Sequence, residues 1–487
     1  MKFNLKVIIR ILGLLTFING FFMLLCLPFS LYYGSQDFKA IIYPGFLSIL
    51  AGLFTWILFN QKSTKKQELT KRDAYIVVTL CWVFMSATGS LPYVYSGVIP
   101  NFTDAFFETM SGYSTTGASV LNNIESIPKG ILLWRSMTQW IGGMGIIVLA
   151  VAILPILGIG GMELFVAEAP GISPDKLKPR IKETAKRLWI IYVGLTVLET
   201  ILLMGAGMSF YDAINHSFTT MSSGGFSTKQ DSVAFYNSPL IEYIIILFMF
   251  IAGTNFTVTY FILKRNFQKV VENEEFKYYF LAIAFFTIMI TYTVYKVTGH
   301  SMEQSFRDSM FQVVSIVTTT GFVTADYTLW SSFATVCFFI LMFFGASAGS
   351  TAGGIKIVRH VVLLKNSLLE LKRQMHPSAI IPVRLNKKGV SQETTYNIIA
   401  FIMIYIMIFA ISSIIMAFIG VDFMTSIGAV ATSLGNIGPG LGKVGPVNNF
   451  AEIPQIGKWL LSLLMLLGRL ELFTVLILFS PYFWKRY

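Results

Sequence analysis

The chain has 487 residues, of which 54% are hydrophobic and 13% are charged, and its mean hydropathy is +0.66. A soluble domain carries about 25% charged residues, so this composition excludes an ordinary soluble protein and indicates a polytopic membrane protein. The three cysteines lie in apolar segments and the four histidines are scattered, so neither a disulfide framework nor a bound metal cofactor is expected.

Ten apolar segments follow one another along the chain, and all but one are long enough to cross a membrane as simple helices. The segments are 7–32, 40–60, 74–97, 131–159, 188–207, 239–263, 278–297, 332–364, 394–419 and 457–483. The first is expected to be a retained helix, because it shows no convincing signal-peptide cleavage site. The last eight bracket four polar, glycine-containing loops in pairs.

Lysine and arginine are distributed unevenly between the connecting segments. With the N-terminus inside, the inner segments hold 28 of the chain's 37 basic residues and the outer segments hold eight. This bias predicts that both termini are cytoplasmic and that the four loops lie outside. The net charge of +12 therefore needs no nucleic acid to explain it, and anionic membrane lipid is the expected partner.

The four loops share a fixed internal spacing around one glycine each. The glycines are Gly117, Gly225, Gly321 and Gly438. A phenylalanine stands fifteen residues before each, and an aspartate stands thirteen before the first three; the fourth copy has Thr425 there. The aspartates are Asp104, Asp212 and Asp308. The copies are 108, 96 and 117 residues apart, which indicates an internal repeat.

Each copy is expected to form a re-entrant loop rather than a span. The aspartate suits a helix N-terminus, where a carboxylate caps free N–H groups. About ten residues of helix then cover roughly 15 Å, half of the hydrocarbon core, before a Ser/Thr/Gly strand returns. Four such loops around an axis would direct carbonyl oxygens at one dehydrated cation. The alternative is four ordinary extracellular turns, which the shared spacing disfavours.

The segment 332–364 contains a stretch of small residues below the expected level of these loops. Its members are Gly345, Ala346, Ser347, Ala348, Gly349, Ser350, Thr351, Ala352, Gly353 and Gly354. A phosphate-binding loop would end in Gly-Lys-Ser/Thr, which is absent. About 14 helical residues from Ser331 would place the break past the midplane. A broken helix that gates a pore is favoured over a small-residue packing face.

Three ionisable residues stand near the middle of their apolar segments. Glu199 is expected to face the bundle interior. Arg469 and Glu471 are two residues apart on a helix, so they do not face each other and each needs its own partner. Arg469 below a cation site would repel a cation and act as a barrier; the alternative is a buried structural ion pair.

These motifs resemble the Trk/Ktr/HKT superfamily of potassium transporters, in its bacterial TrkH type, over the whole chain. The stretches that carry the resemblance are the four loop motifs together with Arg135–Ile146, Gly345–Lys356 and Gly468–Glu471. The resemblance implies an all-α polytopic membrane protein in which two leading helices precede four pseudo-symmetric helix–pore loop–helix repeats around a central pore. The implied boundaries are 1–66, 67–170, 171–270, 271–388 and 389–487.

The resemblance also implies a function and partners. It implies potassium uptake across the bacterial cell membrane, one pore per subunit, with 345–354 as the intramembrane gating loop and Arg469 as the pore arginine. The implied potassium ligands are Thr115, Thr116, Gly117, Ser223, Gly224, Gly225, Thr319, Thr320, Gly321, Asn436, Ile437 and Gly438. It further implies a homodimer and a cytosolic nucleotide-binding regulatory subunit of the TrkA type.

A polytopic membrane enzyme is the competing class of function. It would need converging carboxylates, a histidine cluster or a metal motif at one membrane face, and the sequence offers none of these. No cofactor is expected, and potassium is the transported ligand.

Overall fold

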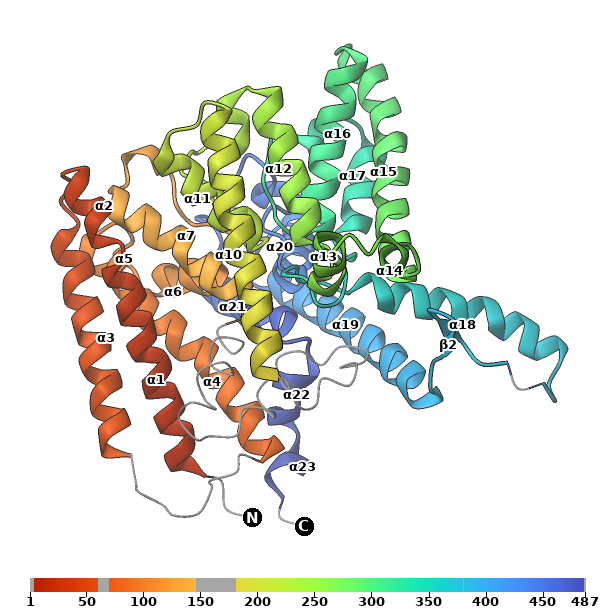
Figure 1. Cartoon of the computed structure of the whole chain (residues 1–487), viewed down its shortest axis with the longest axis horizontal. Coiled ribbons are helices and arrows are strands. Elements are labelled where there is room, and N and C mark those ends of the chain that lie inside the picture. Colours follow the sequence, from red (N-terminus) through yellow and green to blue (C-terminus); the bar gives the residue numbers. More distant parts are fainter. Residues whose placement is uncertain (1–3, 60–69, 146–180, 380, 486–487) are drawn as a thin grey trace.

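The computed structural model describes residues 4–59, 70–145, 181–379 and 381–485 (Figure 1). Within these ranges the chain is mostly helical. The described strands are β1 (Arg384–Leu385) and β2 (Lys388–Gly389), which pair antiparallel with Leu385 opposite Lys388. The predicted all-helical character is therefore confirmed for the described residues.

Six helical segments in the described ranges are long and apolar enough to cross a membrane, so the chain is a polytopic membrane protein. They are Leu5–Tyr32, made of α1 (Leu5–Leu24) and α2 (Leu27–Tyr32); α3 (Phe38–Leu58); Arg72–Ser96, within α4 (Lys71–Gly89) and α5 (Leu91–Ser96); Lys186–Gly205, within α10 (Ile181–Gly205); α15 (Glu274–Thr298); and α19 (Gln392–Phe418).

Two of the segments expected to cross as simple helices are instead divided. Segment 239–263 is divided into α12 (Pro239–Ala252) and α13 (Phe256–Leu263), bent by 112°. The bend occurs because Asn255 caps a new helix by accepting a hydrogen bond from the Thr257 amide. Segment 457–483 is divided into α21 (Gln455–Arg469) and α22 (Phe473–Phe479).

The break in the last segment has an unusual backbone. Glu471 and Leu472 are consecutive residues with positive φ, 55° and 57°, and neither is glycine. Such residues cost free energy and persist only where surrounding contacts impose them. Segment 131–159 is described only as far as residue 145, through α7 (Lys129–Gly143).

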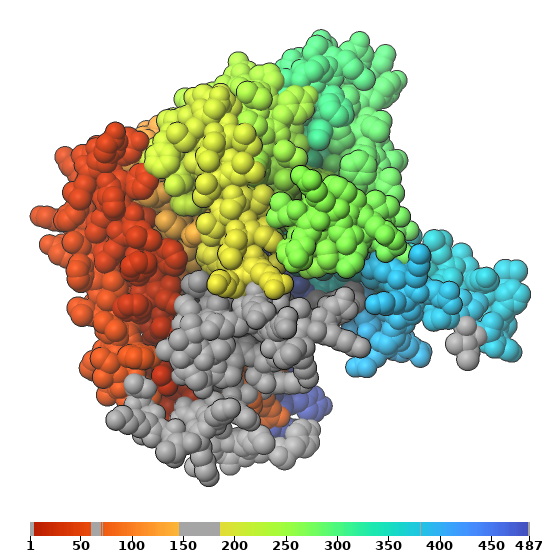
Figure 2. Space-filling model, viewed as in Figure 1, coloured from red at the N-terminus to blue at the C-terminus, as the bar shows by residue number. Residues whose placement is uncertain are grey.

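The predicted break within 332–364 is confirmed, although it begins earlier than expected. Helix α17 (Ser332–Leu341) has ten residues rather than about 14, and the chain stays non-helical until α18 (Ile357–Met375). The two ends of this loop are joined by a short parallel bridge between Gly345 and Lys356. Beyond it, α18 and the start of α19 project from the body of the molecule (Figures 1 and 2).

Four helices of 12 to 16 residues lead into the four repeated loops, and their final turns are buried. They are α6 (Phe102–Tyr113), α11 (Phe210–Met221), α16 (Met302–Val317) and α20 (Phe423–Gly435). The remaining short elements are η1 (Ile124–Ser126), η2 (Ser232–Tyr236), α14 (Phe267–Val271), η3 (Tyr327–Leu329), η4 (Gly442–Val444) and α23 (Pro481–Trp484).

The predicted capping role of the repeated aspartates is wrong. The N-cap is instead the residue before the phenylalanine in three copies, Asn101, Ser209 and Asp422, whose side chain accepts a hydrogen bond from a first-turn amide. Asp212 stands in the first turn and accepts from the Ser209 hydroxyl. In the third copy the helix starts a turn earlier, with Ser301 as its cap.

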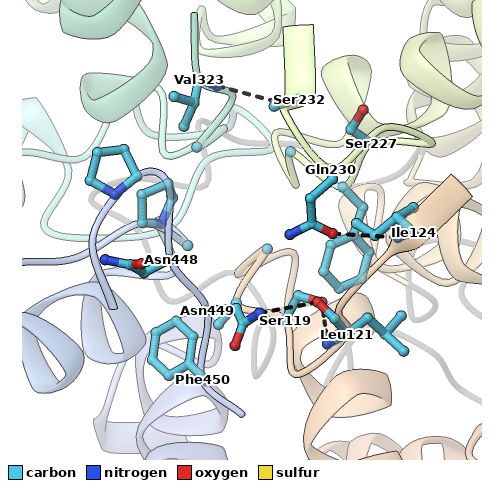
Figure 3. Close-up of a pocket in the computed structure, with 18 of the residues that line it drawn as sticks. Ser119, Leu121, Ile124, Ser227, Gln230, Ser232, Val323, Asn448, Asn449 and Phe450 are labelled. Carbon is cyan, nitrogen blue, oxygen red and sulfur yellow. Dashed lines mark hydrogen bonds between the residues drawn. The ribbon is translucent and has the colours of Figure 1, made fainter. Parts of the chain in front are cut away.

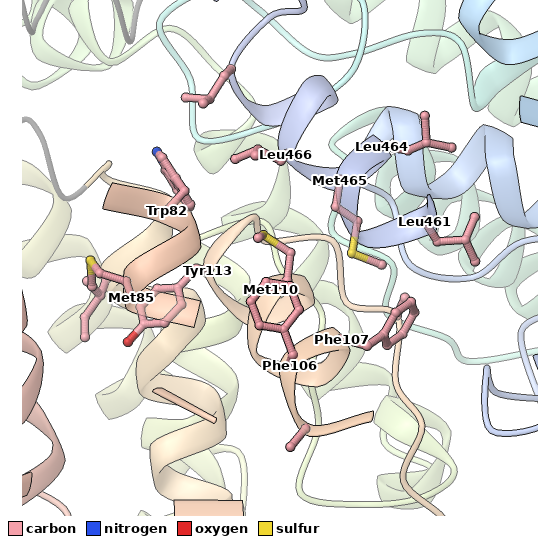
Figure 4. Packing of buried hydrophobic residues seen from close by; sticks show 14 of the residues in the cluster. Trp82, Met85, Phe106, Phe107, Met110, Tyr113, Leu461, Leu464, Met465 and Leu466 are labelled. Carbon is pink, nitrogen blue, oxygen red and sulfur yellow. The ribbon is translucent and has the colours of Figure 1, made fainter. Parts of the chain in front are cut away.

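Helices α4, α6 and α21 share the largest apolar core, in which Trp82, Phe107, Met110, Leu461 and Met465 are buried (Figure 4). Within it, α6 and α21 pack directly against each other. The two ends of the described chain meet near the start of α4. There the Asn4 amide donates to Asp73 at 3.2 Å, and Arg72 donates to the Lys485 carbonyl at 3.1 Å.

Helices α1 and α3 approach closely because glycines face each other at seven-residue intervals. A Cβ on Gly52 would lie 2.6 Å from the Gly13 carbonyl oxygen, and one on Gly20 would lie 2.6 Å from the Gly45 carbonyl oxygen. Small residues at this spacing let membrane helices pack backbone to backbone.

We therefore expect Gly52→Leu to force α1 and α3 apart and to lower stability by about 1–3 kcal/mol. The measurement is thermal unfolding in detergent. Gly194→Leu is the matched control, since Gly194 is also inside a helix but has open space where its Cβ would be. Equal melting temperatures for the two variants would contradict the close packing.

Candidate ion-binding site

The four repeated loops have one backbone conformation. The residue two before each repeat glycine is left-handed with φ between 54° and 57°, although none of the four is glycine. These residues are Thr115, Ser223, Thr319 and Asn436. The repeat glycines are also left-handed, with φ between 75° and 99°. The shared spacing therefore corresponds to a shared geometry.

Each loop begins as a regular helix C-terminus. The amide of the residue before the repeat glycine donates to the carbonyl oxygen five residues earlier, at 2.8–3.0 Å in all four copies. The four pairs are Thr116 with Ser111, Gly224 with Thr219, Thr320 with Ser315, and Ile437 with Thr432. This is the bond that closes a helix after a left-handed residue, and it turns the chain sharply back.

The loops meet in a closed ring, in chain order. A Cβ on Gly117 would lie 2.2 Å from the Gly224 oxygen, one on Gly225 1.9 Å from the Thr320 oxygen, one on Gly321 2.0 Å from the Ile437 oxygen, and one on Gly438 2.8 Å from the Thr116 oxygen. Each repeat glycine thus faces a carbonyl of the next copy, and the fourth faces the first. Only glycine fits both this proximity and the left-handed backbone.

The twelve residues predicted as potassium ligands therefore lie together, in four triplets of three consecutive residues. We call the four facing oxygens, those of Thr116, Gly224, Thr320 and Ile437, the carbonyl ring. On one side of it lies a cavity of about 80 Å³ lined by all four repeat glycines (Figure 3). Its outer wall includes Ser119, Gln230 and Asn449.

The predicted gating loop lies against the other side of the triplets. Thr351 shares a hydroxyl–hydroxyl hydrogen bond of 2.8 Å with Ser223, and the Gly353 amide donates to the Thr319 hydroxyl at 2.8 Å. Arg469 donates to the Thr115 hydroxyl at 3.1 Å. The hydroxyl groups of three copies are thus held by the loop and by Arg469.

Arg469 is held mainly by carbonyl oxygens. It donates to Thr351 and Gly142 at 2.7 Å each and to Gly143 at 3.0 Å. Glu471 instead forms an ion pair with Arg359, so the prediction of separate partners is confirmed. Glu199 is fully buried, as predicted for an acid facing the bundle interior.

A row of residues behind the loops was missed, although the repeat spacing could have found it. Nine residues before the repeat glycines stand Glu108, His216, Gln312 and Ala429. Glu108 accepts from the Val120 amide at 2.8 Å, His216 contacts the Ser227 hydroxyl at 3.0 Å, and Gln312 donates to Thr324 at 3.3 Å. Three copies thus brace the outgoing strand, and the alanine of the fourth copy does not.

Three ion pairs, each with at least one buried partner, hold the helices around the ring. Arg135 of α7 contacts Glu108 at 2.7 Å, Glu242 of α12 contacts Arg307 at 2.8 Å, and Lys458 of α21 contacts Asp104 at 2.7 Å. The last two join different copies of the repeat: the second to the third, and the fourth to the first. A hydrogen bond of 2.8 Å from the Tyr327 hydroxyl to the Gly440 carbonyl joins the third to the fourth.

Comparison with known proteins is consistent with this arrangement. The family model described as TrkH, cation transport protein, matches residues 39–486. The chain belongs to the TrkH cation transport protein family.

Relatives within the family match at full length. The chain is 40% identical to the Trk system potassium uptake protein TrkH of Escherichia coli strain K12, over 99% of this chain and 100% of that protein. It is 37% identical to the protein of the same name from Halomonas elongata, with the same coverage. The crystal structure of the potassium transporter TrkH from Vibrio parahaemolyticus matches with a TM-score of 0.88 at 36% identity, over 99% of this chain and 100% of that one.

The Arg135–Glu108 pair should be important for stability, since the side chains are only 3% and 0% exposed. Arg135→Met would leave a buried carboxylate without its cation and should lower stability by about 3–5 kcal/mol. Thermal unfolding of the purified protein measures this. Lys443→Met is the control, because the Lys443–Glu452 contact is 3.9 Å long and its side chains are 69% and 79% exposed. A loss of stability in Arg135→Met no larger than that in Lys443→Met would contradict the stabilising role of the Arg135–Glu108 pair.

Proposed function

We propose that the chain takes up potassium across the bacterial cell membrane, through a filter formed by the four loops around a central pore. The closed carbonyl ring is the observation that carries this proposal. Backbone oxygens gathered in this way can replace the hydration shell of a cation. The relatives named above, described as potassium uptake proteins, support potassium as that cation.

The repeat boundaries in this proposal are those expected from the sequence. Two leading helices (1–66) precede repeats at 67–170, 171–270, 271–388 and 389–487. Each repeat contributes one re-entrant helix and one triplet of filter residues, supported by the identical backbone of the four loops. Non-helical backbone at this depth is tolerated because its polar groups are either buried by neighbouring protein or line the cavity.

Residues 345–354 act as the gate in this proposal, and Arg469 holds the gate closed. In support, the loop and Arg469 engage filter hydroxyls directly, and Arg469 also bonds the loop carbonyl of Thr351. Opening requires these contacts to break together. Arg469 keeps its charge in any local environment, so it also repels a cation that leaves the filter.

The protein acts as a homodimer with both termini in the cytoplasm, together with a cytosolic nucleotide-binding subunit of the TrkA type. The inward bias of 28 basic residues supports this orientation. The proximity of Asn4, Arg72 and Lys485 places the first and last described helices at one end of the molecule, as two cytoplasmic termini require.

Serine at the repeat glycines should reduce discrimination against sodium, since a Cβ would push a ring carbonyl out of place. The fall in the potassium/sodium flux ratio should be larger for Gly225→Ser than for Gly438→Ser, whose approaches are 1.9 and 2.8 Å. Fluxes are measured in proteoliposomes. Gly97→Ser is the control: Gly97 is also left-handed, with φ of 73°, but faces open space. Unchanged ratios in both filter variants would rule out the filter.

Arg469→Ala should raise potassium flux in the absence of the regulatory subunit, because it releases the loop and removes the repelling charge. Arg469→Lys keeps the charge but cannot span the same four acceptors, so intermediate flux is expected. Flux per folded protein and melting temperature are measured together. Normal or lower flux with a large loss of stability in Arg469→Ala would mean that the arginine is purely structural.

A further inference from the structure

The motif Arg135–Ile146 includes most of α7, and one face of this helix lies along the second filter loop. Gln139 donates from Nε2 to the Gly224 carbonyl at 2.7 Å and accepts through Oε1 from the Phe226 amide at 3.0 Å. One helical turn earlier, Arg135 donates to the Ser227 carbonyl at 3.0 Å and lies 3.6 Å above the Phe226 ring. The two side chains together bind three residues of one strand.

The backbone fixes which way the Gln139 amide points. The Phe226 amide can only donate and the Gly224 carbonyl can only accept, so Oε1 must face the first and Nε2 the second. Gln139 is fully buried, so neither contact competes with bulk water. A buried amide with both ends satisfied by backbone is a rigid link between α7 and the filter strand.

Gly224 supplies one of the four oxygens of the carbonyl ring. Among the described residues, a side-chain donor reaches the ring oxygen of Gly224, whereas no hydrogen bond reaches those of Thr116, Thr320 and Ile437. The ring oxygen of the second copy therefore already accepts a hydrogen bond from an N–H group, and within the described part of the chain the other three ring oxygens do not.

A second observation points to the same asymmetry. The ring position carries a side chain in three copies, Thr116, Thr320 and Ile437, and none in the second. A Cβ on Gly224 would lie 2.4 Å from Gln139 Cδ, so the glutamine occupies the space that a side chain would need. Gln139 can therefore occupy its position only because residue 224 is glycine.

We propose that Gln139 is a positioning residue that sets ion selectivity by restraining and weakening the Gly224 carbonyl. The proposal rests on the filter function given above. A carbonyl that also accepts an amide hydrogen presents a weaker field to a cation and moves inward less readily. Weak, widely spaced ligands favour potassium, whereas stronger and closer ones compensate the dehydration of the smaller sodium ion. Gln139 therefore favours potassium.

Gln139→Met tests this inference, because it keeps the approximate volume and removes the amide. The potassium/sodium flux ratio in proteoliposomes should fall by about threefold or more, since field strength at the ring rises. Gln312→Met is the matched control: Gln312 is an equally buried glutamine, but its amide reaches the Thr324 hydroxyl and not the ring. Its ratio should stay within about twofold of the parent's.

Gln139→Leu is the second variant. It also removes both polar contacts but fills the site with a different shape, so a folding failure of one apolar variant leaves the other to be measured. Its ratio should also fall. A parent-like ratio in a folded Gln139→Leu or Gln139→Met protein overturns the inference, as does an equal fall in Gln312→Met. If the parent protein itself does not prefer potassium, the filter proposal fails instead.

Discussion

The close approach of each repeat glycine to a carbonyl oxygen of the next copy is the constraint on which the rest of the structure depends. Each of these oxygens lies 1.9–2.8 Å from the position that a Cβ on the facing glycine would occupy. The four loops therefore have almost no freedom to shift independently. The elements around them serve to hold this ring. Ion pairs fix neighbouring helices and polar residues behind the loops brace three of the outgoing strands. The loop 342–356 contacts the triplets on the side away from the cavity.

Sequence spacing predicted the four loops and the broken helix, because both depend on residue types that only special backbone accommodates. Glycine is required at 117 and its three counterparts because φ is positive there, and φ is also positive at Gly349 and Gly354 of the broken segment. The caps were misassigned because Asp104 and Asp212 lie in a first turn that a preceding Asn or Ser already caps. The capping signal alone does not distinguish adjacent positions.

Other features depend on contacts between distant segments and could not be read from spacing. Segments 239–263 and 457–483 each read as one apolar span, yet a cap at Asn255 divides the first and a pair of positive-φ residues, Glu471 and Leu472, divides the second. The partner of Glu471 lies 112 residues away, at Arg359. Gln139 is a polar residue in apolar surroundings, and only the fold shows that it faces a filter strand.

The four loops share a backbone but belong to one polypeptide, and this has a consequence for how the ring can vary. In an assembly of four identical chains, one codon change alters all four quarters of an opening at once. Here it alters a single quarter, so Ala429 can stand where other copies have Glu, His or Gln, and Asn436 where they have a hydroxyl. Each substitution therefore changes one of the four copies and leaves the other three as they were, so the shape and polarity of the opening can vary one side at a time.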